Sequence, residues 1–383
     1  MISNFRPCFA AVIRSMFYVF LIPHVEAQEH LPVTNLDLLA KVEGGNVVAI
    51  APFPDDAATL IATRSGHFLT LKDGTIEGAE FLDMSDRVSV LETLQGDSGV
   101  TDFVFSQGYE NDGALYVCYT PVGSEFALRV TRITMPTAEE QVLLDIPFAH
   151  GEFDFLPPSF GGDLAFGPDG LLYIGTGDGF KWEVDEANAA LAQSLLSFEG
   201  KILRIDPAKS EDGKPYGIPA DNPFLDRADA LPEIWAIGLQ DPQLLFLPDS
   251  ERLVVVDHYM WGAEYGSNIE VNLITLEEAA GANFEWPWIN GRNESSVWPS
   301  HSLSENSIVP QFDSGMREIF GDASAVGAFW VDGVLELPVT TIFLPSALLY
   351  IAEDPAGMDG LRTGFQFGEC CQSVLTAAGR SSG

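Results

Sequence analysis

Basic residues are scarce in this sequence: 19 lysines and arginines stand against 56 aspartates and glutamates, which gives a formal net charge of −37. A surface this acidic repels phosphate groups, so nucleic acid and anionic membranes are poor partners. Two interpretations of the carboxylates are open, and both can hold together. They form a solvated acidic coat, or some of them gather to bind calcium, which prefers carboxylate and carbonyl oxygens.

Cysteine is also scarce, with four residues in a chain of 383. Cys8 lies near the N-terminus, and Cys118, Cys370 and Cys371 form an odd set without the spacing of a metal site. The sequence therefore predicts neither a disulfide framework nor a zinc site of cysteines. Cys118 stands among apolar strand residues, which indicates a small core side chain.

The N-terminal apolar run is too short to cross a membrane. It covers residues 15–22, follows two arginines, ends at Pro23 and precedes small residues that close with Ala27. This order of positive, apolar and small residues predicts a removable export signal over residues 1–27. We therefore expect a secreted or periplasmic protein without a membrane span.

One short phrase recurs four times along the chain. Each copy has an aspartate turn followed by apolar and β-branched residues, as in GPDGLLYIGT from Gly167. This pattern predicts a hairpin that leads into a buried strand. The turn aspartates are Asp55, Asp112, Asp169 and Asp249, so the first three copies are evenly spaced and the fourth follows after a longer interval. A period of this size with one hairpin per copy is typical of a propeller blade, and the longer interval indicates an insertion before the fourth copy.

The predicted fold is an all-β, six-bladed β-propeller of four-stranded antiparallel blades. Residues 28–356 form this domain, because the chain after the export signal leaves room for about six copies of the period. Residues 357–383 show no clear strand turn and are predicted to form an irregular tail. Two alternatives stay open there: a frayed end, or a last blade that is truncated.

Five phrases in the middle of the chain follow one another in a fixed order: 160–179, 197–207, 216–224, 232–242 and 281–291. Together they resemble the soluble quinoprotein glucose/sorbosone dehydrogenase family, which implies a six-bladed propeller. The resemblance also implies pyrroloquinoline quinone (PQQ) and calcium at the mouth of the propeller channel, and an aldose substrate oxidised at its anomeric carbon. In that chemistry a histidine takes the proton of the sugar hydroxyl while hydride moves to the quinone.

The sequence departs from the family pattern at the positions that carry this chemistry. The resemblance places Ser159 where the family has its catalytic histidine, and Asp163 where it has an arginine. Gln240 and Asp241 stand in place of an arginine–asparagine pair, and Asp97 in place of a glutamate or glutamine of the cofactor site. A serine hydroxyl is no general base at neutral pH without a base of its own. We therefore expect little or no turnover with the quinone.

Two histidines are candidate substitutes for the missing base. His258 follows Asp257 at the end of an apolar run, where the pair can bind metal or act as a base, although neighbouring strand residues point to opposite faces. His150 lies near Ser159, and its alternative is an ordinary solvated histidine. Asp257 and Glu270 match an acidic phrase of the family and are the predicted calcium ligands.

Two functions from different classes are therefore open. The first is an exported sugar dehydrogenase that uses PQQ and calcium, which the resemblance favours. The second is a non-catalytic propeller that binds a carbohydrate or a protein partner through the same face, which the substitutions at Ser159, Asp163, Gln240 and Asp241 favour. Sites rather than folds carry function, so the fold does not decide between them.

Overall fold

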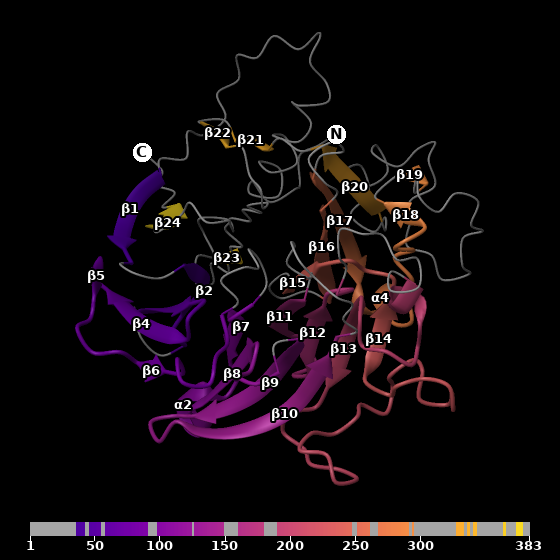
Figure 1. The fold of residues 1–383 in the computed structure, drawn as a ribbon, viewed down its shortest axis with the longest axis horizontal. Helices are drawn as coiled ribbons and strands as arrows, with labels where there is room; N and C mark the ends of the chain where they lie inside the picture. Colours follow the sequence, from indigo (N-terminus) through magenta and orange to yellow (C-terminus); the bar gives the residue numbers. More distant parts are fainter. Residues whose placement is uncertain are drawn as a thin grey trace.

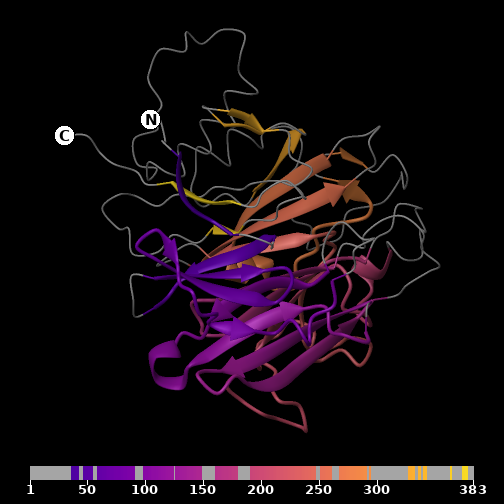
Figure 2. The ribbon, with the colours of Figure 1, turned by 60° about the vertical axis from the view of Figure 1, so that its left-hand side comes forward.

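The computed structural model is a β-propeller whose sheets follow one another along the chain (Figure 1, Figure 2). Its longer described segments are 36–42, 46–54, 58–90, 98–124, 126–148, 160–179, 190–246, 251–260 and 267–290. The remaining described residues are the strand segments 293–294, 327–332, 335–337, 340–342, 363–364 and 373–377. The predicted export signal over residues 1–27 lies outside them, so export stays a prediction.

Four sheets in the described residues have the form of propeller blades. Blade 1 contains β2 (Val47–Pro52), β3 (Thr59–Thr63), β4 (His67–Lys72) and a split outer strand made of β5 (Thr75–Ile76) and β6 (Leu82–Asp83). Blade 2 contains β7 (Val100–Phe105), β8 (Ala114–Tyr119), β9 (Ala127–Thr134) and β10 (Glu139–Pro147). Blade 3 contains β11 (Gly161–Phe166), β12 (Leu172–Thr176), β13 (Lys201–Ile205) and β14 (Ile234–Ile237). Blade 4 contains β15 (Pro242–Phe246), β16 (Arg252–Met260), β17 (Ser267–Thr275) and β20 (Gly327–Asp332).

The described residues form four blades, not the six that we predicted. The prediction divided the chain length by the shortest spacing of the repeat, but blade 3 uses more chain than that. In this blade one connection runs from Thr176 in β12 to Lys201 in β13, and another runs from Ile205 in β13 to Ile234 in β14. Such connections lengthen a blade without adding strands, so the chain length overestimates the number of blades that the described residues form.

Strands from the end of the chain pair with strands from its beginning. β24 (Ser373–Ala377) is antiparallel to β1 (Leu36–Lys41), and β23 (Thr363–Gly364) is antiparallel to β2. Both β23 and β24 lie in the segment 357–383 that we predicted to be irregular. An unpaired strand edge exposes free N–H and C=O groups, which is a physical reason for this pairing.

The other described elements are short. They are α2 (Tyr109–Asp112), η1 (Ala190–Gln193), α4 (Leu276–Ala279), β18 (Ile289–Asn290), β19 (Asn293–Glu294), β21 (Leu335–Leu337) and β22 (Thr340–Ile342). Within the described residues, no helix has both the length and the apolar character that a membrane span requires.

The hydrophobic core lies between neighbouring blades. Blades 1 and 2 share one buried cluster, blades 2 and 3 share a second, and blades 3 and 4 share a third, in which Tyr173, Trp235 and Leu244 pack together. All residues of β8 and of β13 are buried. A middle strand of a blade is covered on both faces by the adjacent blades, which explains why β8 is a continuous apolar run, whereas β13 also buries Lys201 and Arg204.

The repeated aspartate has the predicted turn role where the structure describes it. The Asp112 carboxylate accepts a hydrogen bond from the backbone N–H of Ala114 at 2.9 Å, and Asp169 accepts one from Leu171 at 3.1 Å. An aspartate that bonds to the backbone two residues ahead favours a tight turn. Asp55 and Asp249, the other two copies, lie outside the described residues.

Candidate functional site

Two loops meet at the same end of blade 3. One follows β12 and contains Asp178, and the other joins β14 to β15 through Gly238, Gln240 and Asp241. The backbone N–H of Asp178 donates to the carbonyl of Gln240 at 2.8 Å. Gly238 has φ of 81°, and a Cβ there would lie 2.2 Å from Asn283 Oδ1, so this turn requires glycine. The predicted cofactor residues Gln240 and Asp241 are thereby placed beside Asp178.

A fully buried carboxylate holds the second loop in place. Asp257 in β16 accepts two hydrogen bonds from the backbone N–H of Gln240, at 3.1 and 2.9 Å, and one from that of Asp241, at 2.7 Å. Because Pro242 is the register partner of Asp257, the β15–β16 ladder sets this geometry. The structure therefore brings together three of the residues that the sequence selected.

The Gln240 side chain is buried with its polar atoms unsatisfied. Its exposed fraction is 0%, and neither Oε1 nor Nε2 has a hydrogen-bond partner in the described part of the chain. Buried polar groups are almost always hydrogen-bonded, so a buried group without a protein partner indicates a binding position for a ligand or an ordered water. Gln240 thus offers one donor group and one acceptor at the centre of the site.

Asp178 joins the site to the loop that follows α4. Its side-chain Oδ2 accepts a hydrogen bond from the indole N–H of Trp286 at 2.7 Å, and both residues are buried. Trp286 is therefore a packing aromatic and not a platform for a sugar ring.

Lys201 is a buried cation near the carboxylates of Asp178 and Glu199. Its ammonium donates to the carbonyl oxygens of Leu191, Ala192 and Glu199 at 2.8, 2.8 and 2.5 Å. Burial lowers the pKa of Lys201 to about 7, against the opposite influence of the carboxylates of Glu199 and Asp178. Its three N–H bonds are used within the protein. Lys201 was not predicted as a site residue, although a lysine at the start of an apolar strand was a signal.

Asp163 serves the packing of blades 3 and 4. Its Oδ2 accepts a hydrogen bond from the backbone N–H of Leu244 at 2.7 Å. Asp102 makes the same contact one blade earlier, where its Oδ2 accepts from the N–H of Leu164 at 2.8 Å. In both cases an aspartate on the first strand of a blade bonds to the first strand of the next blade. This use accounts for an aspartate at position 163 without a cofactor.

We expect Asp163→Ala to lower the free energy of unfolding by about 1–3 kcal/mol, because it leaves the Leu244 N–H unpaired between two blades. Asp163→Asn retains an acceptor oxygen and should lose less. Urea unfolding followed by tryptophan fluorescence measures both. If the alanine variant is as stable as the original protein, the contact between the blades contributes nothing.

Five other predicted residues are placed only in part or not at all. Ser159, His150 and Asp97 lie outside the described residues. Glu270 in β17 is the register partner of Asp257, and His258 is that of Ile269. The backbone therefore places Asp257 and Glu270 on neighbouring strands, and calcium binding by this pair stays a prediction.

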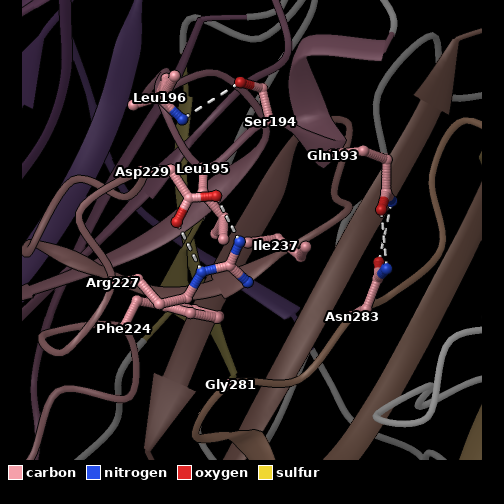
Figure 3. A pocket seen from close by; sticks show the side chains of 10 residues that line it. All are labelled: Gln193, Ser194, Leu195, Leu196, Phe224, Arg227, Asp229, Ile237, Gly281 and Asn283. Atoms are coloured by element: carbon pink, nitrogen blue, oxygen red, sulfur yellow. Dashed lines mark hydrogen bonds and ion pairs between the residues drawn. The ribbon is translucent and has the colours of Figure 1, made fainter.

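A separate pocket of about 480 Å³ lies beside η1 and β14 (Figure 3). Gln193 and Asn283 exchange two amide hydrogen bonds on one side of it, and Arg227 pairs with Asp229 on the other. Its lining residues are Gln193, Ser194, Leu195, Leu196, Phe224, Arg227, Asp229, Ile237, Gly281 and Asn283. None of the predicted site residues lines this pocket.

Comparison with known protein families decides the relationship. Residues 46–312 match the family model described as glucose/sorbosone dehydrogenase. The chain belongs to the glucose/sorbosone dehydrogenase family. The expected resemblance is therefore confirmed.

Curated relatives of this glucose/sorbosone dehydrogenase family member have different names. HIPL2 protein of Arabidopsis thaliana is 36% identical over 58% of this chain and 33% of its own length. Human Hedgehog-interacting protein is 30% identical over 48% of this chain and 27% of its own length. The match thus spans about a third or less of these two curated relatives.

Solved structures of similar proteins support the fold. A putative oxidoreductase (glucose dehydrogenase) from Thermus thermophilus is 30% identical, covers 69% of this chain and 70% of its own, and has a TM-score of 0.51. The apo-form of the soluble aldose sugar dehydrogenase from Escherichia coli is 21% identical, covers 71% of this chain and 73% of its own, and has a TM-score of 0.52. The PQQ-bound aldose sugar dehydrogenase from Streptomyces coelicolor is 22% identical, covers 70% of this chain and 71% of its own, and has a TM-score of 0.50.

The described site of this glucose/sorbosone dehydrogenase family member does not fit PQQ. The quinone carries three carboxylates, and the suitable partners for carboxylates are arginine guanidinium groups and other cations. At the positions that the resemblance assigns to the cofactor, this chain has Asp163, Gln240 and Asp241, and the buried residues Asp178 and Asp257 bond to Gln240. The ammonium of Lys201 is bonded to three carbonyl groups. A tricarboxylate would therefore meet repulsion here.

Proposed function

We propose that this chain is a ligand-binding propeller of the sugar dehydrogenase family that binds a neutral, polyhydroxylated molecule of the sugar class near Gln240. The observation that carries the proposal is the buried carboxamide, which has no partner within the described residues. An amide both donates to and accepts from hydroxyl groups, so it suits a sugar better than an anion. Serine at position 159 in place of the family histidine is the reason to expect binding without oxidation.

The surroundings of Gln240 support a neutral ligand. The carboxylates of Asp178, Asp241 and Asp257 are buried around its backbone and give the site a negative potential. Such a potential opposes an anion and tolerates a polyol, whose hydroxyl groups donate to carboxylates. Export through residues 1–27 and calcium at Asp257 and Glu270 are parts of the same proposal.

A second candidate is a protein-binding propeller. The similarity to Hedgehog-interacting protein favours it, since the name of that relative describes a protein partner. The two candidates differ in their ligand, so binding measurements with sugars distinguish them.

The test uses Gln240→Leu, which removes both polar groups and keeps the size of the side chain. We expect the affinity of this variant for sugar to fall by more than about tenfold, because the hydrogen-bonding groups of the site are removed. We also expect its ligand-free form to gain about 1–2 kcal/mol of stability, because an unsatisfied buried amide is replaced by an apolar group. Isothermal titration with a panel of mono- and oligosaccharides, together with urea unfolding, measures both effects. Gln141→Leu, on the exposed face of β10, is the matched control.

Three results would contradict the proposal. Dye reduction by the unmodified protein with PQQ, calcium and an aldose would show a dehydrogenase. A destabilised Gln240→Leu would show that the carboxamide already has a partner. Failure of every sugar to bind, together with capture of a protein partner through this face, would favour the second candidate.

Ser159→His combined with Gln240→Arg should restore PQQ binding if these positions correspond to those of the family.

A further inference from the structure

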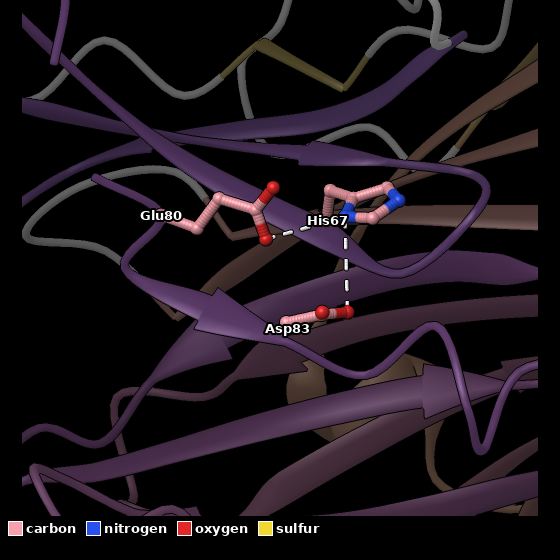
Figure 4. Close-up of side chains that lie close together, drawn as sticks. All are labelled: His67, Glu80 and Asp83. Carbon is pink, nitrogen blue, oxygen red and sulfur yellow. Dashed lines mark hydrogen bonds and ion pairs between the residues drawn. The ribbon is translucent and has the colours of Figure 1, made fainter. Parts of the chain in front are cut away.

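Three side chains of the types that bind metal ions converge on blade 1 (Figure 4). His67 Nδ1 lies 3.3 Å from Glu80 Oε2 and 3.7 Å from Asp83 Oδ1. The three ligand atoms all lie within 4.8 Å of one another. His67 is partly buried, and Glu80 and Asp83 are exposed, so solvent reaches the cluster.

The sheet brings these side chains together. His67 at the start of β4 is the register partner of Asp83 in β6, so their side chains lie on the same face. Thr63 fixes the backbone of His67: its hydroxyl donates to the His67 carbonyl and accepts from the His67 N–H, both at 3.1 Å. Asp83 Oδ1 accepts from the Ser85 N–H at 2.9 Å, and this bond lowers the pKa of the Asp83 carboxyl below its ordinary value. Two of the three ligands are therefore held by contacts outside the cluster.

Two of the three distances between the ligand atoms are close to the geometry that a zinc ion requires. Zinc binds histidine nitrogen and carboxylate oxygen at about 2.0–2.2 Å, so tetrahedral ligand atoms lie roughly 3.3–3.6 Å apart. The two measured separations, 3.3 and 3.7 Å, are close to this edge length. An imidazole ligand also favours a cation of the zinc class over calcium, which takes oxygen ligands.

We propose that His67, Glu80 and Asp83 bind one divalent cation of the zinc class, with water at the remaining position. The site joins β4 to the segment between the two short outer strands of blade 1. The outer strand of this blade is split into β5 and β6, two residues each, and Glu80 lies between them. A cation bound here ties this connection to β4 and neutralises two carboxylates of a strongly acidic chain.

The experiment titrates zinc chloride into the full chain, purified without a histidine tag, by calorimetry. We expect one strong site per chain, and His67→Gln and Glu80→Gln should each weaken it by more than about tenfold, because loss of an outer-shell partner alone costs about 10–100-fold. Glu77→Gln, an exposed carboxylate on the same blade, is the matched control and should bind as the original protein does. Glu80 is exposed, so its variant should fold even if the histidine variant does not.

A second measurement reports on the site itself. The N–H groups of Phe81 and Met84 bond to the carbonyls of Phe68 and Gly66 on either side of the cluster. Zinc should slow hydrogen exchange at these two amides in the original protein and in Glu77→Gln, but not in Glu80→Gln. Equal zinc affinity in all variants would overturn the proposal. Calcium binding that competes with zinc at equal concentration would overturn the assignment of the metal class.

Discussion

Arg204→Met should lower the free energy of unfolding by about 3 kcal/mol, because it removes a buried guanidinium that pairs with two carboxylates. The Arg204 side chain in β13 is only 8% exposed. Its guanidinium donates to Asp169 at 2.9 Å and to both carboxylate oxygens of Asp221 at 3.0 and 3.1 Å, and it lies 5.7 Å from the ring centre of Tyr173. Without the guanidinium, the turn aspartate Asp169 loses the cation that compensates its charge.

Arg204 also connects two distant parts of blade 3. Asp169 belongs to the repeated turn between β11 and β12, and Asp221 belongs to the long connection between β13 and β14. Asn222 adds to this link, since its side-chain amide donates to the carbonyls of Arg204 and Pro232 at 3.0 and 2.8 Å. Loss of Arg204 should therefore loosen the long connection as well as the turn.

Urea unfolding and hydrogen exchange test this prediction together. The matched control is Arg227→Met, which removes another arginine that forms two hydrogen bonds with an aspartate, Asp229. That pair is solvent-exposed, and exposed ion pairs contribute little to stability, so we expect almost no change. Equal effects of the two substitutions would show that burial of Arg204 has no energetic role. Faster exchange confined to residues near the long connection would identify that segment as the first to open.

The repeat was a strong predictor of the fold because turn chemistry is local. Asp112 and Asp169 bond to the backbone two residues ahead, which needs no knowledge of distant parts of the chain. The number of blades depends instead on how much chain the connections use, as in the long connection from Ile205 in β13 to Ile234 in β14. Nothing in the local pattern fixes that length, so the six-blade prediction differs from the four described blades.

The site was predictable in its location and less so in its chemistry. The resemblance to the family led to Gln240, Asp241 and Asp257, and the structure brings them together. It did not reveal that Asp163 bonds to the next blade, because Leu244 is far from it along the chain. The same holds for Lys201, whose partners become visible only when the loop before β13 folds back on it.

Lys201 gives a prediction about pH. In the unfolded chain this lysine keeps its proton up to its ordinary pKa of 10.5, whereas burial lowers the folded-state pKa to about 7. Between these values the unfolded state binds more protons than the folded state, so the free energy of unfolding rises with pH. The gain approaches about 1.4 kcal/mol per pH unit for a single proton.

We therefore expect the original protein to gain about 2 kcal/mol of stability relative to Lys201→Met between pH 7 and pH 9. The comparison cancels every other titrating group, provided that the two proteins share the rest of their structure. The measurements stay below pH 10 because burial also raises the pKa values of Tyr119, Tyr173 and Tyr216. These tyrosines lower the stability of the protein only at higher pH, where they ionise in the unfolded chain. Urea unfolding at pH 6, 7, 8 and 9 measures the difference.

The outcome separates two physical descriptions of the buried ammonium. If desolvation dominates, the stability difference grows with pH as stated, and Lys201 is neutral in part at pH 7. If the three carbonyl acceptors of Leu191, Ala192 and Glu199 dominate, the proton stays on Lys201 and the difference is flat over the same range. A flat difference would contradict the prediction. It would also place a permanent positive charge beside Asp178, which would weaken the case for a site that repels the anionic quinone.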